Sequence, residues 1–283
     1  MSSGHPPLPE PLAVAVADSH CHLDIGVEGR DGEDGLPVEE ALARAGAVGV
    51  PRIVQIGCDL VGARWAVDAA NRYDEIVAGV SLHPNEAARL ARDGDDTALV
   101  DALAEIDKLA ADPRVRAVGE TGLDYFRTGD EGRAVQHRSF RAHIEMAKRH
   151  GKALVIHDRD AHDDVLRTLA EEGSPDRVVL HCFSGDVEMA RECVRRGYWL
   201  SFAGTVTFKN AAMLRNALAV TPAEQLLVET DAPFLTPTPY RGQPNASYLI
   251  PLTLRAMAEV KKVPVDELAS AVAANTEAAF DSW

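Results

Sequence analysis

Short apolar runs alternate with longer segments of mixed apolar and polar residues along most of the chain. Apolar runs of this length, bounded by turn-forming residues, are typical of buried parallel strands. We therefore predict eight strands, at residues 14–18, 52–57, 76–81, 115–119, 153–156, 177–180, 198–202 and 226–228.

The segments between these runs have the apolar spacing of amphipathic helices. We predict helices at residues 38–47, 61–72, 95–111, 133–150, 161–171, 187–196, 210–220 and 248–261, with a further helix at 265–274. Three glycines, Gly151, Gly173 and Gly197, fall just past predicted helix ends, where glycine relieves the strain of a left-handed backbone.

Eight strand–helix units in one chain predict an α/β protein with a (β/α)8 barrel, formed by a single domain over residues 14–283. A doubly wound sheet is the alternative, but no glycine fingerprint for a dinucleotide follows the first strand. Residues 1–13 are rich in proline and are expected to be a disordered lead-in, and residues 26–35 an acidic surface loop.

Composition narrows the class of protein. The net charge of -15 argues against a broad basic surface that grips a nucleic-acid backbone, so a phosphate substrate would need a local cationic site. No apolar run is long enough to span a bilayer or to form a secretory signal, and the four cysteines lack the spacing of a disulfide scaffold. We expect a cytoplasmic protein that does not bind membranes, with no stable protein partner.

Polar side chains cluster at the ends of the predicted strands, where barrel enzymes place their active sites. Five of the ten histidines occupy such positions, together with two carboxylates. The strand-end residues are His20, His22, His83, Glu120, His157, His181 and Asp231.

Two of these histidines, His20 and His22, are separated by one residue and point to the same face of a strand. Cys21 between them points to the opposite face and is expected to be a packing residue. Together with His157, His181, Glu120 and Asp231 they form a set of four imidazoles and two carboxylates, which suits two divalent cations. Glu229 shares a face with Asp231, but Asp231 lies further toward the rim and is preferred as the ligand.

Several motifs resemble the TatD family of metal-dependent deoxyribonucleases, within the wider amidohydrolase-like barrels. The matching stretches run in order along the chain from about Asp18 to the C-terminus. They are DSHCHLD at 18–24, GVSLHPNEA at 79–87, VGETGLDYFR at 118–127, VIHDRDAHDDVL at 155–166, HCFSG at 181–185, ETDAPFLTP at 229–237 and RGQPN at 241–245.

The resemblance implies a role for each strand-end ligand. His20 and His22 would bind one metal ion, His157 and His181 the other, Glu120 would bridge the two ions and Asp231 would complete the site. Family members are divalent-metal nucleases, several of them 3′ to 5′ exonucleases, so DNA strand ends are the expected substrate. The ions would be Mg²⁺, Mn²⁺ or Zn²⁺.

Two motifs depart from the family pattern. Relatives often have G-V-H-P-H after the third strand, whereas this chain has Ser81-Leu82-His83-Pro84-Asn85. Relatives often have R-G-x-x-N-E-P near the C-terminus, whereas here Asn245 is followed by Ala246. Both departures fall on predicted substrate-side loops, so they bear on substrate preference.

The expected reaction is in-line attack of a metal-activated water on a phosphodiester, with Asp231 accepting the proton of the water. Asp231 and Glu120 are thus the predicted catalytic residues. The candidates for holding the substrate phosphate are His83, Arg159, Lys209 and Arg241. Each of them is equally compatible with an ordinary surface ion pair. Tyr125 and Phe126 would either stack on a terminal base or pack the rim.

Two other functions are compatible with parts of this pattern. The same binuclear site could serve an amidohydrolase that cleaves a lactone, a cyclic amide or a small phosphoester. Many such sites are bridged by a carboxylated lysine at the fourth strand, where this chain has Glu120. The chain could also be a non-catalytic binding module, which the absence of some metal ligands would favour. All six expected metal ligands are present, so this function is disfavoured.

Overall fold

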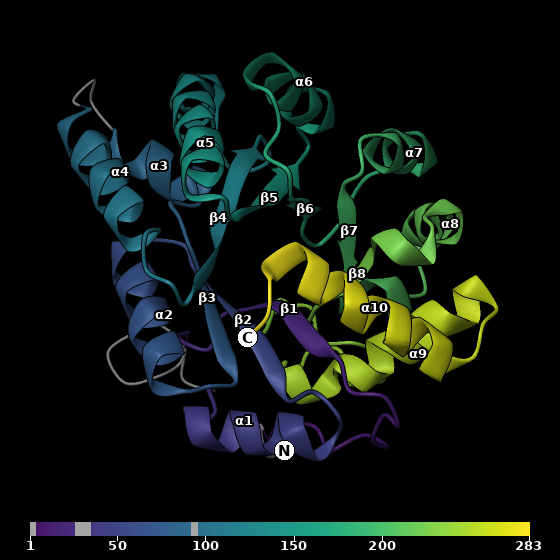
Figure 1. Cartoon of the computed structure of the whole chain (residues 1–283). Coiled ribbons are helices and arrows are strands. Elements are labelled where there is room, and N and C mark those ends of the chain that lie inside the picture. The colour runs from purple at the N-terminus through teal and green to yellow at the C-terminus, as the bar shows by residue number, and fades with distance from the viewer. Residues whose placement is uncertain (1–3, 26–34, 92–95) are drawn as a thin grey trace. The chain divides into compact units, whose positions relative to one another are not determined.

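Eight strands, each followed along the chain by a helix, form the framework of the computed structural model, which describes residues 4–25, 35–91 and 96–283 (Figure 1). The strands belong to one sheet and are hydrogen-bonded in sequence order from β1 to β8. This arrangement is the predicted (β/α)8 barrel fold. The acidic loop expected at 26–35 lies outside the described residues except for Gly35.

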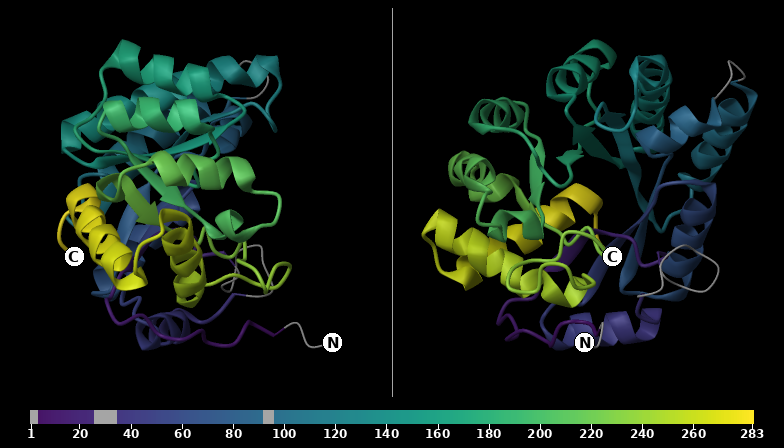
Figure 2. Two further views of the ribbon diagram at one scale, coloured as in Figure 1. Left: turned by 90° about the vertical axis from the view of Figure 1, so that its right-hand side faces the viewer. Right: turned by 180° about the vertical axis from the view of Figure 1, so that it is seen from behind.

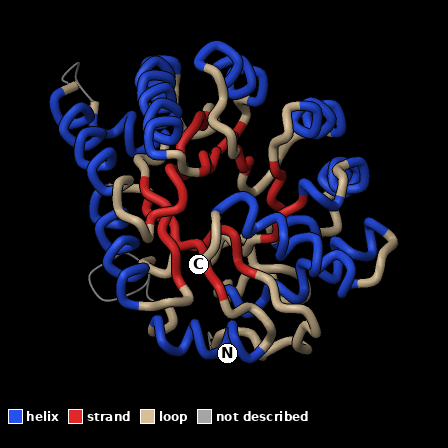
Figure 3. The backbone as a smooth tube through the Cα atoms, viewed as in Figure 1, coloured by secondary structure: helices blue, strands red, loops and turns tan. Residues whose placement is uncertain are grey.

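The strands are short and buried on both faces, as in parallel sheets covered by helices (Figure 3). They are β1 (Ala17–Cys21), β2 (Arg52–Gly57), β3 (Ile76–Val80), β4 (Val115–Asp124), β5 (Ala153–Arg159), β6 (Val178–Leu180), β7 (Trp199–Phe202) and β8 (Leu226–Val228).

All nine predicted helices are present within the described residues, with ends that differ by a few residues. The helices are α1 (Val38–Ala47), α2 (Leu60–Arg72), α3 (Pro84–Leu90), α4 (Thr97–Leu109), α5 (Asp130–His150), α6 (His162–Glu172), α7 (Val187–Arg195), α8 (Ala212–Val220), α9 (Ile250–Lys261) and α10 (Val265–Phe280), with 3-10 turns η2 (Gly204–Thr207), η3 (Ala223–Gln225) and η4 (Ser247–Leu249). Gly151 and Gly173 cap α5 and α6 with φ of 61° and 75°, as their positions predicted.

The predictions differ from the structure at several strand ends, two of which matter for the site, and they missed one helix. The first strand begins at Ala17 rather than residue 14 and includes His20. The fourth strand continues past residue 119 to Asp124, because its backbone pairs with β5 as far as Asp124 opposite Arg159. Helix α3 was not predicted; Pro84 occupies its first turn, where a missing N–H costs nothing.

The chain forms two compact units, and the first consists of residues 1–55, 185–278 and 282–283. In it β7 pairs with β8, and β1 pairs with the first part of β2. Cys21 is fully buried and packs with Ile53 and Ala232, which confirms its expected packing role. Helices α8 and α9 lie beside each other in both views of Figure 2.

Residues 4–13, part of the expected disordered lead-in, make defined contacts within this first unit. The hydroxyl of Tyr248 donates a hydrogen bond to the carbonyl of Pro6 at 2.6 Å, and Arg255 donates to the carbonyl of Glu10 at 2.9 Å. The amide of Leu12 donates to the carbonyl of Val48 at 3.0 Å. These bonds hold the described part of the segment against η4, α9 and the end of α1.

The second unit consists of residues 56–184 and 279–281. Strands β3, β4, β5 and β6 pair in parallel within it, and α5 packs against β4 through buried side chains that include Phe140 and Ile144. The pairing places the C-terminal ends of β4, β5 and β6 side by side. No helix in the described part of the chain has both the length and the apolar character needed to cross a bilayer.

Candidate metal centre

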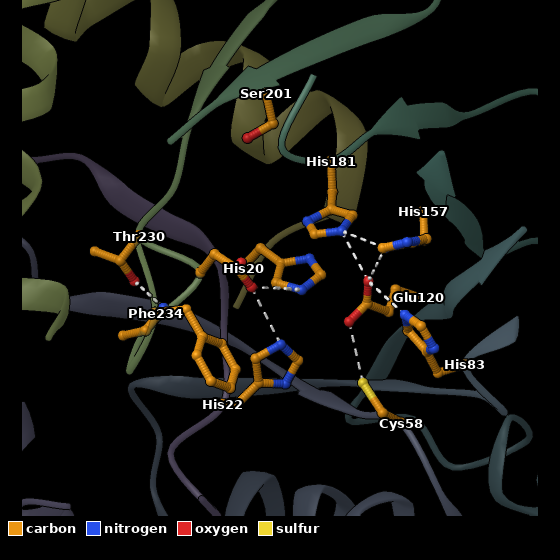
Figure 4. Close-up of polar contacts among 12 residues, drawn as sticks. His20, His22, Cys58, His83, Glu120, His157, His181, Ser201, Thr230 and Phe234 are labelled. Atoms are coloured by element: carbon orange, nitrogen blue, oxygen red, sulfur yellow. Dashed lines mark hydrogen bonds and ion pairs between the residues drawn. The ribbon is translucent and has the colours of Figure 1, made fainter. Parts of the chain in front are cut away.

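Three predicted ligands converge at the ends of β4, β5 and β6 in the second unit (Figure 4). Nε2 of His181 lies 2.7 Å from Oε2 of Glu120, and Nδ1 of His157 lies 3.1 Å from the same oxygen. The two imidazole nitrogens are 3.5 Å apart. Three donor atoms thus point to one small volume, as ligands of a single cation do.

The parallel ladder produces this convergence. Gly122 pairs with His157 across β4 and β5, and the amide of His181 donates to the carbonyl of Ile156 at 3.1 Å. His181 therefore follows β6 at the level where β5 presents His157. The three side chains come from positions far apart in sequence but adjacent along the sheet edge.

The electrostatics of this group favour a bound cation. Burial raises the pKa of Glu120, but the charge of His181, the nearby His83 and the hydrogen bonds from His157 and His181 outweigh burial, so that the net pKa lies well below the usual range. Burial lowers the pKa of His157, but Asp124 and Glu120 outweigh burial and raise it overall. A buried, ionised carboxylate flanked by imidazoles has the donor chemistry that divalent ions require.

His83 lies beside this cluster as the N-cap of α3. Its Nδ1 accepts a hydrogen bond from the amide of Asn85 at 3.1 Å, and its Nε2 lies 3.9 Å from Oε2 of Glu120. Burial and the nearby charge of His157 lower the pKa of His83 to about 3. The imidazole is therefore neutral, and because Nδ1 is an acceptor, the ring proton is on Nε2.

The other three predicted ligands meet in the first unit, where β1 and the segment after β8 lie together. Oδ1 of Asp231 is 3.3 Å from Nε2 of His22 and 3.9 Å from Nε2 of His20. The two imidazoles are arranged edge to face, with centroids 5.1 Å apart. His20, His22 and Asp231 are three of the six ligands expected from the sequence, and the preference for Asp231 over Glu229 stays a prediction.

Backbone hydrogen bonds attach the segment that carries Asp231 to β1. The amide of Asp231 donates to the carbonyl of His20 at 2.9 Å, and the amide of His22 donates to the carbonyl of Ala232 at 2.8 Å. Asp231 itself has a φ of 54°, a left-handed conformation that aspartate tolerates better than most residues. These two backbone hydrogen bonds hold the carboxylate of Asp231 beside the two histidines.

Two buried polar residues support this segment through Thr230. Asp18 accepts hydrogen bonds from the backbone amide and the hydroxyl of Thr230 at 2.9 and 2.5 Å, and the side-chain amide of Asn245 donates to the carbonyl of Thr230 at 2.9 Å. Burial raises the pKa of Asp18 to about 7 against the hydrogen bonds from Thr230. Asn245, in the RGQPN stretch, therefore contributes by fixing the loop of Asp231.

The predicted phosphate-binding cations are located on three different elements. Arg159 ends β5, and its guanidinium lies 3.8 Å from the ring centroid of Phe126, which is 62% exposed. Arg241 is exposed and stacks 4.4 Å from the ring centroid of Phe208. Lys209 is exposed after η2. Their contact with substrate stays a prediction.

The structure also identifies residues that the sequence analysis missed. Asp124 lies at the end of β4, with Oδ2 at 3.3 Å from Nε2 of His157. The thiol of Cys58 donates to Oε1 of Glu120 at 3.1 Å. Asp124 lacked a clear signal, because it shares a strand face with Glu120 only through the extension of β4 beyond residue 119. Cys58 had none, since it is adjacent to Glu120 only in space.

A (β/α)8 barrel with histidine–carboxylate clusters at its strand ends is an arrangement suited to a metal-dependent hydrolase. The family model for TatD-related DNases matches residues 17–281, and the chain belongs to that family.

Relatives of known sequence or structure cover nearly the whole chain. An uncharacterized metal-dependent hydrolase named TatD from Mycobacterium tuberculosis is 46% identical over 270 residues, which are 94% of this chain and 97% of the relative. An uncharacterized metal-dependent hydrolase named YabD from Bacillus subtilis is 37% identical, with 93% of this chain and 98% of the relative covered. The crystal structure of YJJV, a TatD homologue from Escherichia coli K12, is similar with a TM-score of 0.83 and 29% identity, covering 95% of this chain and 98% of that one.

Proposed function

We propose that this metal-dependent hydrolase is a deoxyribonuclease that cleaves phosphodiester bonds at DNA strand ends, in the 3′ to 5′ direction. The observation that carries the proposal is the convergence of His157 Nδ1 and His181 Nε2 on the buried carboxylate of Glu120. Family membership supports a nuclease over other hydrolases, since the matching family model is that of TatD-related DNases.

Two divalent ions would be held by the two ligand groups. His157, His181 and Glu120 form one group, and His20, His22 and Asp231 form the other. When bound, such ions lower the pKa of a coordinated water and neutralise charge on phosphoryl oxygens. The bridging role of Glu120 and the choice among Mg²⁺, Mn²⁺ and Zn²⁺ belong to the proposal.

Residues of the chain itself supply the proton transfer and the orientation of the substrate. The carboxylate of Asp231 is partly accessible and would accept a proton from the attacking water. His83, neutral with its proton on Nε2, would donate a hydrogen bond to a phosphoryl oxygen. Arg159 would hold a neighbouring phosphate as a fixed cation.

The net charge of -15 fits removal of nucleotides from an end better than binding along a duplex. A few local cations can hold one or two phosphates, whereas a long duplex would need a broad basic surface. We propose DNA strand ends as the partner and the cytoplasm as the place of action.

The proposal is tested by removing divalent ions with a chelator and adding back Mg²⁺, Mn²⁺ or Zn²⁺ separately. Each sample is assayed with single-stranded DNA, duplex DNA, RNA and a panel of lactones. We expect metal-restored release of nucleotides from DNA 3′ ends. Metal-restored hydrolysis of lactones without nucleotide release would overturn the nuclease assignment in favour of the amidohydrolase alternative.

The number of ions is tested separately by Asp231→Asn. Elemental analysis of saturated, gel-filtered protein is expected to find two ions per wild-type chain and one per variant, because the amide is a much poorer ligand than the carboxylate. Asp163→Asn, in the first turn of α6, is the matched control and should retain both ions. Equal metal content in wild type and Asp231→Asn would contradict the assignment of Asp231 as a ligand.

A further inference from the structure

Asp124 is almost completely buried at the C-terminal end of β4, beside the imidazole of His157. Its Oδ2 lies 3.3 Å from Nε2 of His157, while Nδ1 of the same ring lies 3.1 Å from Glu120. The two nitrogens of one imidazole thus face two different carboxylates. Glu120 is a predicted ligand of the ion, whereas Asp124 lies on the other side of the ring.

We infer that Asp124 is a positioning residue that keeps the proton of His157 on Nε2 and so directs the lone pair of Nδ1 to the metal ion. A neutral imidazole carries one N–H, and only the nitrogen without it can coordinate a cation. A carboxylate beside Nε2 favours the tautomer with the proton there, and such partners orient metal-bound histidines in many proteins. The inference rests on the proposed metal site, and it does not depend on the identity of the substrate.

Asp124 can perform this role because its carboxylate is held on both oxygens. The backbone amide of Arg127 donates to Oδ1 at 2.9 Å, and the side-chain amide of Asn85 donates to Oδ2 at 3.0 Å. The backbone of Asp124 is held as well, since its amide donates to the side chain of Gln136 at 3.0 Å and its carbonyl accepts from Gln136 at 3.2 Å. The carboxylate therefore has little freedom to turn away from His157.

This arrangement gives a function to one departure from the family pattern. Asn85 is the residue at which the third-strand motif departs from the pattern that the resemblance implied, and its side chain bridges two groups. Its Nδ2 donates to Asp124, and its Oδ1 accepts from the hydroxyl of Thr128 at 2.9 Å. Because the Thr128 bond fixes the amide orientation, the NH₂ group of Asn85 faces the carboxylate.

An alternative use of the same atoms is direct ligation by Asp124, because His83, Asp124 and His157 also present donor atoms within 4.8 Å of one another. That arrangement would require the lone pair of His157 on Nε2, the opposite tautomer. The position of one proton therefore distinguishes a positioning carboxylate from a ligating one.

The test is Asp124→Asn, which keeps the shape of the side chain. Nitrogen-15 NMR of the Zn²⁺-loaded protein reports which nitrogen of His157 keeps its proton, and calorimetry with Zn²⁺ alone reports affinity. We expect wild-type His157 to carry its proton on Nε2 when Zn²⁺ is bound. In the variant Zn²⁺ affinity is expected to fall about 10- to 100-fold, because nothing then holds that proton on Nε2. An unchanged affinity of the variant, or a wild-type proton on Nδ1, would overturn the inference.

A matched control lies next to His157 on β5. Asp158 also pairs with an imidazole, that of His162 at 2.8 Å, and Asp158→Asn should leave the tautomer of His157 and Zn²⁺ affinity unchanged. If Asp124→Asn does not fold, Asn85→Ala provides a milder test, with a smaller loss of affinity expected from the freed carboxylate. Wild-type protein that binds none of Zn²⁺, Mn²⁺ and Mg²⁺ would overturn the proposed function instead, so the two failures are distinguishable.

Discussion

Nε2 of His181 lies 2.7 Å from Oε2 of Glu120, and both side chains are almost completely buried in the second unit. Taking a carboxylate out of water is costly unless cations or hydrogen-bond donors replace the lost solvation. Glu120 has this compensation from two imidazoles, and a bound divalent ion would supply more. The relationship makes Glu120 the residue on which the proposed metal site most directly depends.

Substitution of Glu120 by glutamine tests this dependence. Glutamine preserves the shape but removes the charge, so we expect the affinity for Zn²⁺ and the rate of nucleotide release each to fall more than about 100-fold, beyond the usual effect of residues around a metal. Calorimetry and an end-labelled DNA assay measure the two effects. Glu188→Gln, on the exposed side of α7, is the control. Full activity of Glu120→Gln would disprove a role for Glu120 as ligand or bridge.

Substitution of Arg159 by glutamine tests the contact with substrate. Hydrogen bonds to charged groups contribute about 1.5–3 kcal/mol, so the KM for single-stranded DNA should rise about tenfold or more with little change in kcat. The salt dependence of KM should also weaken, because one phosphate contact is lost. Arg64→Gln removes an arginine whose guanidinium is already paired with Glu105 and should leave KM unchanged. An equal KM in both variants and wild type would exclude Arg159 from the substrate site.

The fully buried His143 should make stability depend on pH. Its Nε2 accepts a hydrogen bond from the amide of Leu82 at 3.1 Å, and Nδ1 is 2.7 Å from the carbonyl of Ser139. Burial lowers the pKa of His143 from 6.5 to about 4 despite the bond to Ser139. Between these values the unfolded chain binds more protons, so the free energy of unfolding falls as the pH decreases.

The contribution of His143 is fully present above pH about 6.5 and lost by pH about 4, an effect of about 3 kcal/mol. Urea unfolding of His143→Gln at a series of pH values should therefore show a smaller loss of stability on the acid side than wild type. His150→Gln, on the same helix but beside Asp107 at the surface, should not reduce that loss. Identical acid dependence in wild type and His143→Gln would refute the prediction.

Gly57 ends β2 where the backbone of α2 approaches closely. A Cβ at Gly57 would lie 2.4 Å from the backbone of Ala63, so Gly57→Ala should lower the free energy of unfolding by about 1–3 kcal/mol through overpacking. Gly46, near the end of α1, has open space at the same position, and Gly46→Ala should raise stability by about 0.5–1 kcal/mol. Thermal unfolding of the two variants measures both shifts. A decrease of the same size in each would show that the close contact is not the cause.

The class of fold was predictable because it depends on local patterns. Runs of apolar residues separated by amphipathic segments produce the same alternation whichever strands finally pair. The six predicted ligands were recognisable for a related reason. Residues that end consecutive parallel strands lie at the same edge of the sheet, so polar residues there are brought near one another without knowledge of the loops.

The ends of elements were less predictable, because they depend on pairing between distant segments. Nothing in the sequence near residue 119 shows that the fourth strand continues, since two glycines and two polar residues at 119–122 resemble a turn. Their backbone is nevertheless paired with β5. Helix α3 is short and has little periodicity of its own, and it is defined by its cap at His83.

The sequence by itself determined the barrel class, the family and the identity of the predicted ligands, because these follow from local periodicity and short motifs. The tertiary structure alone decided how the ligands are supported: Asp124 beside His157, Asn85 against Asp124, and Thr230 held by Asp18. The two residues of each of these contacts come from different elements of the fold, and Asn85 and Asp124 are 39 positions apart in the sequence. Hydrogen-bond direction depends on atoms that meet only in the folded chain, and these atoms determine which nitrogen of a histidine can bind a metal ion.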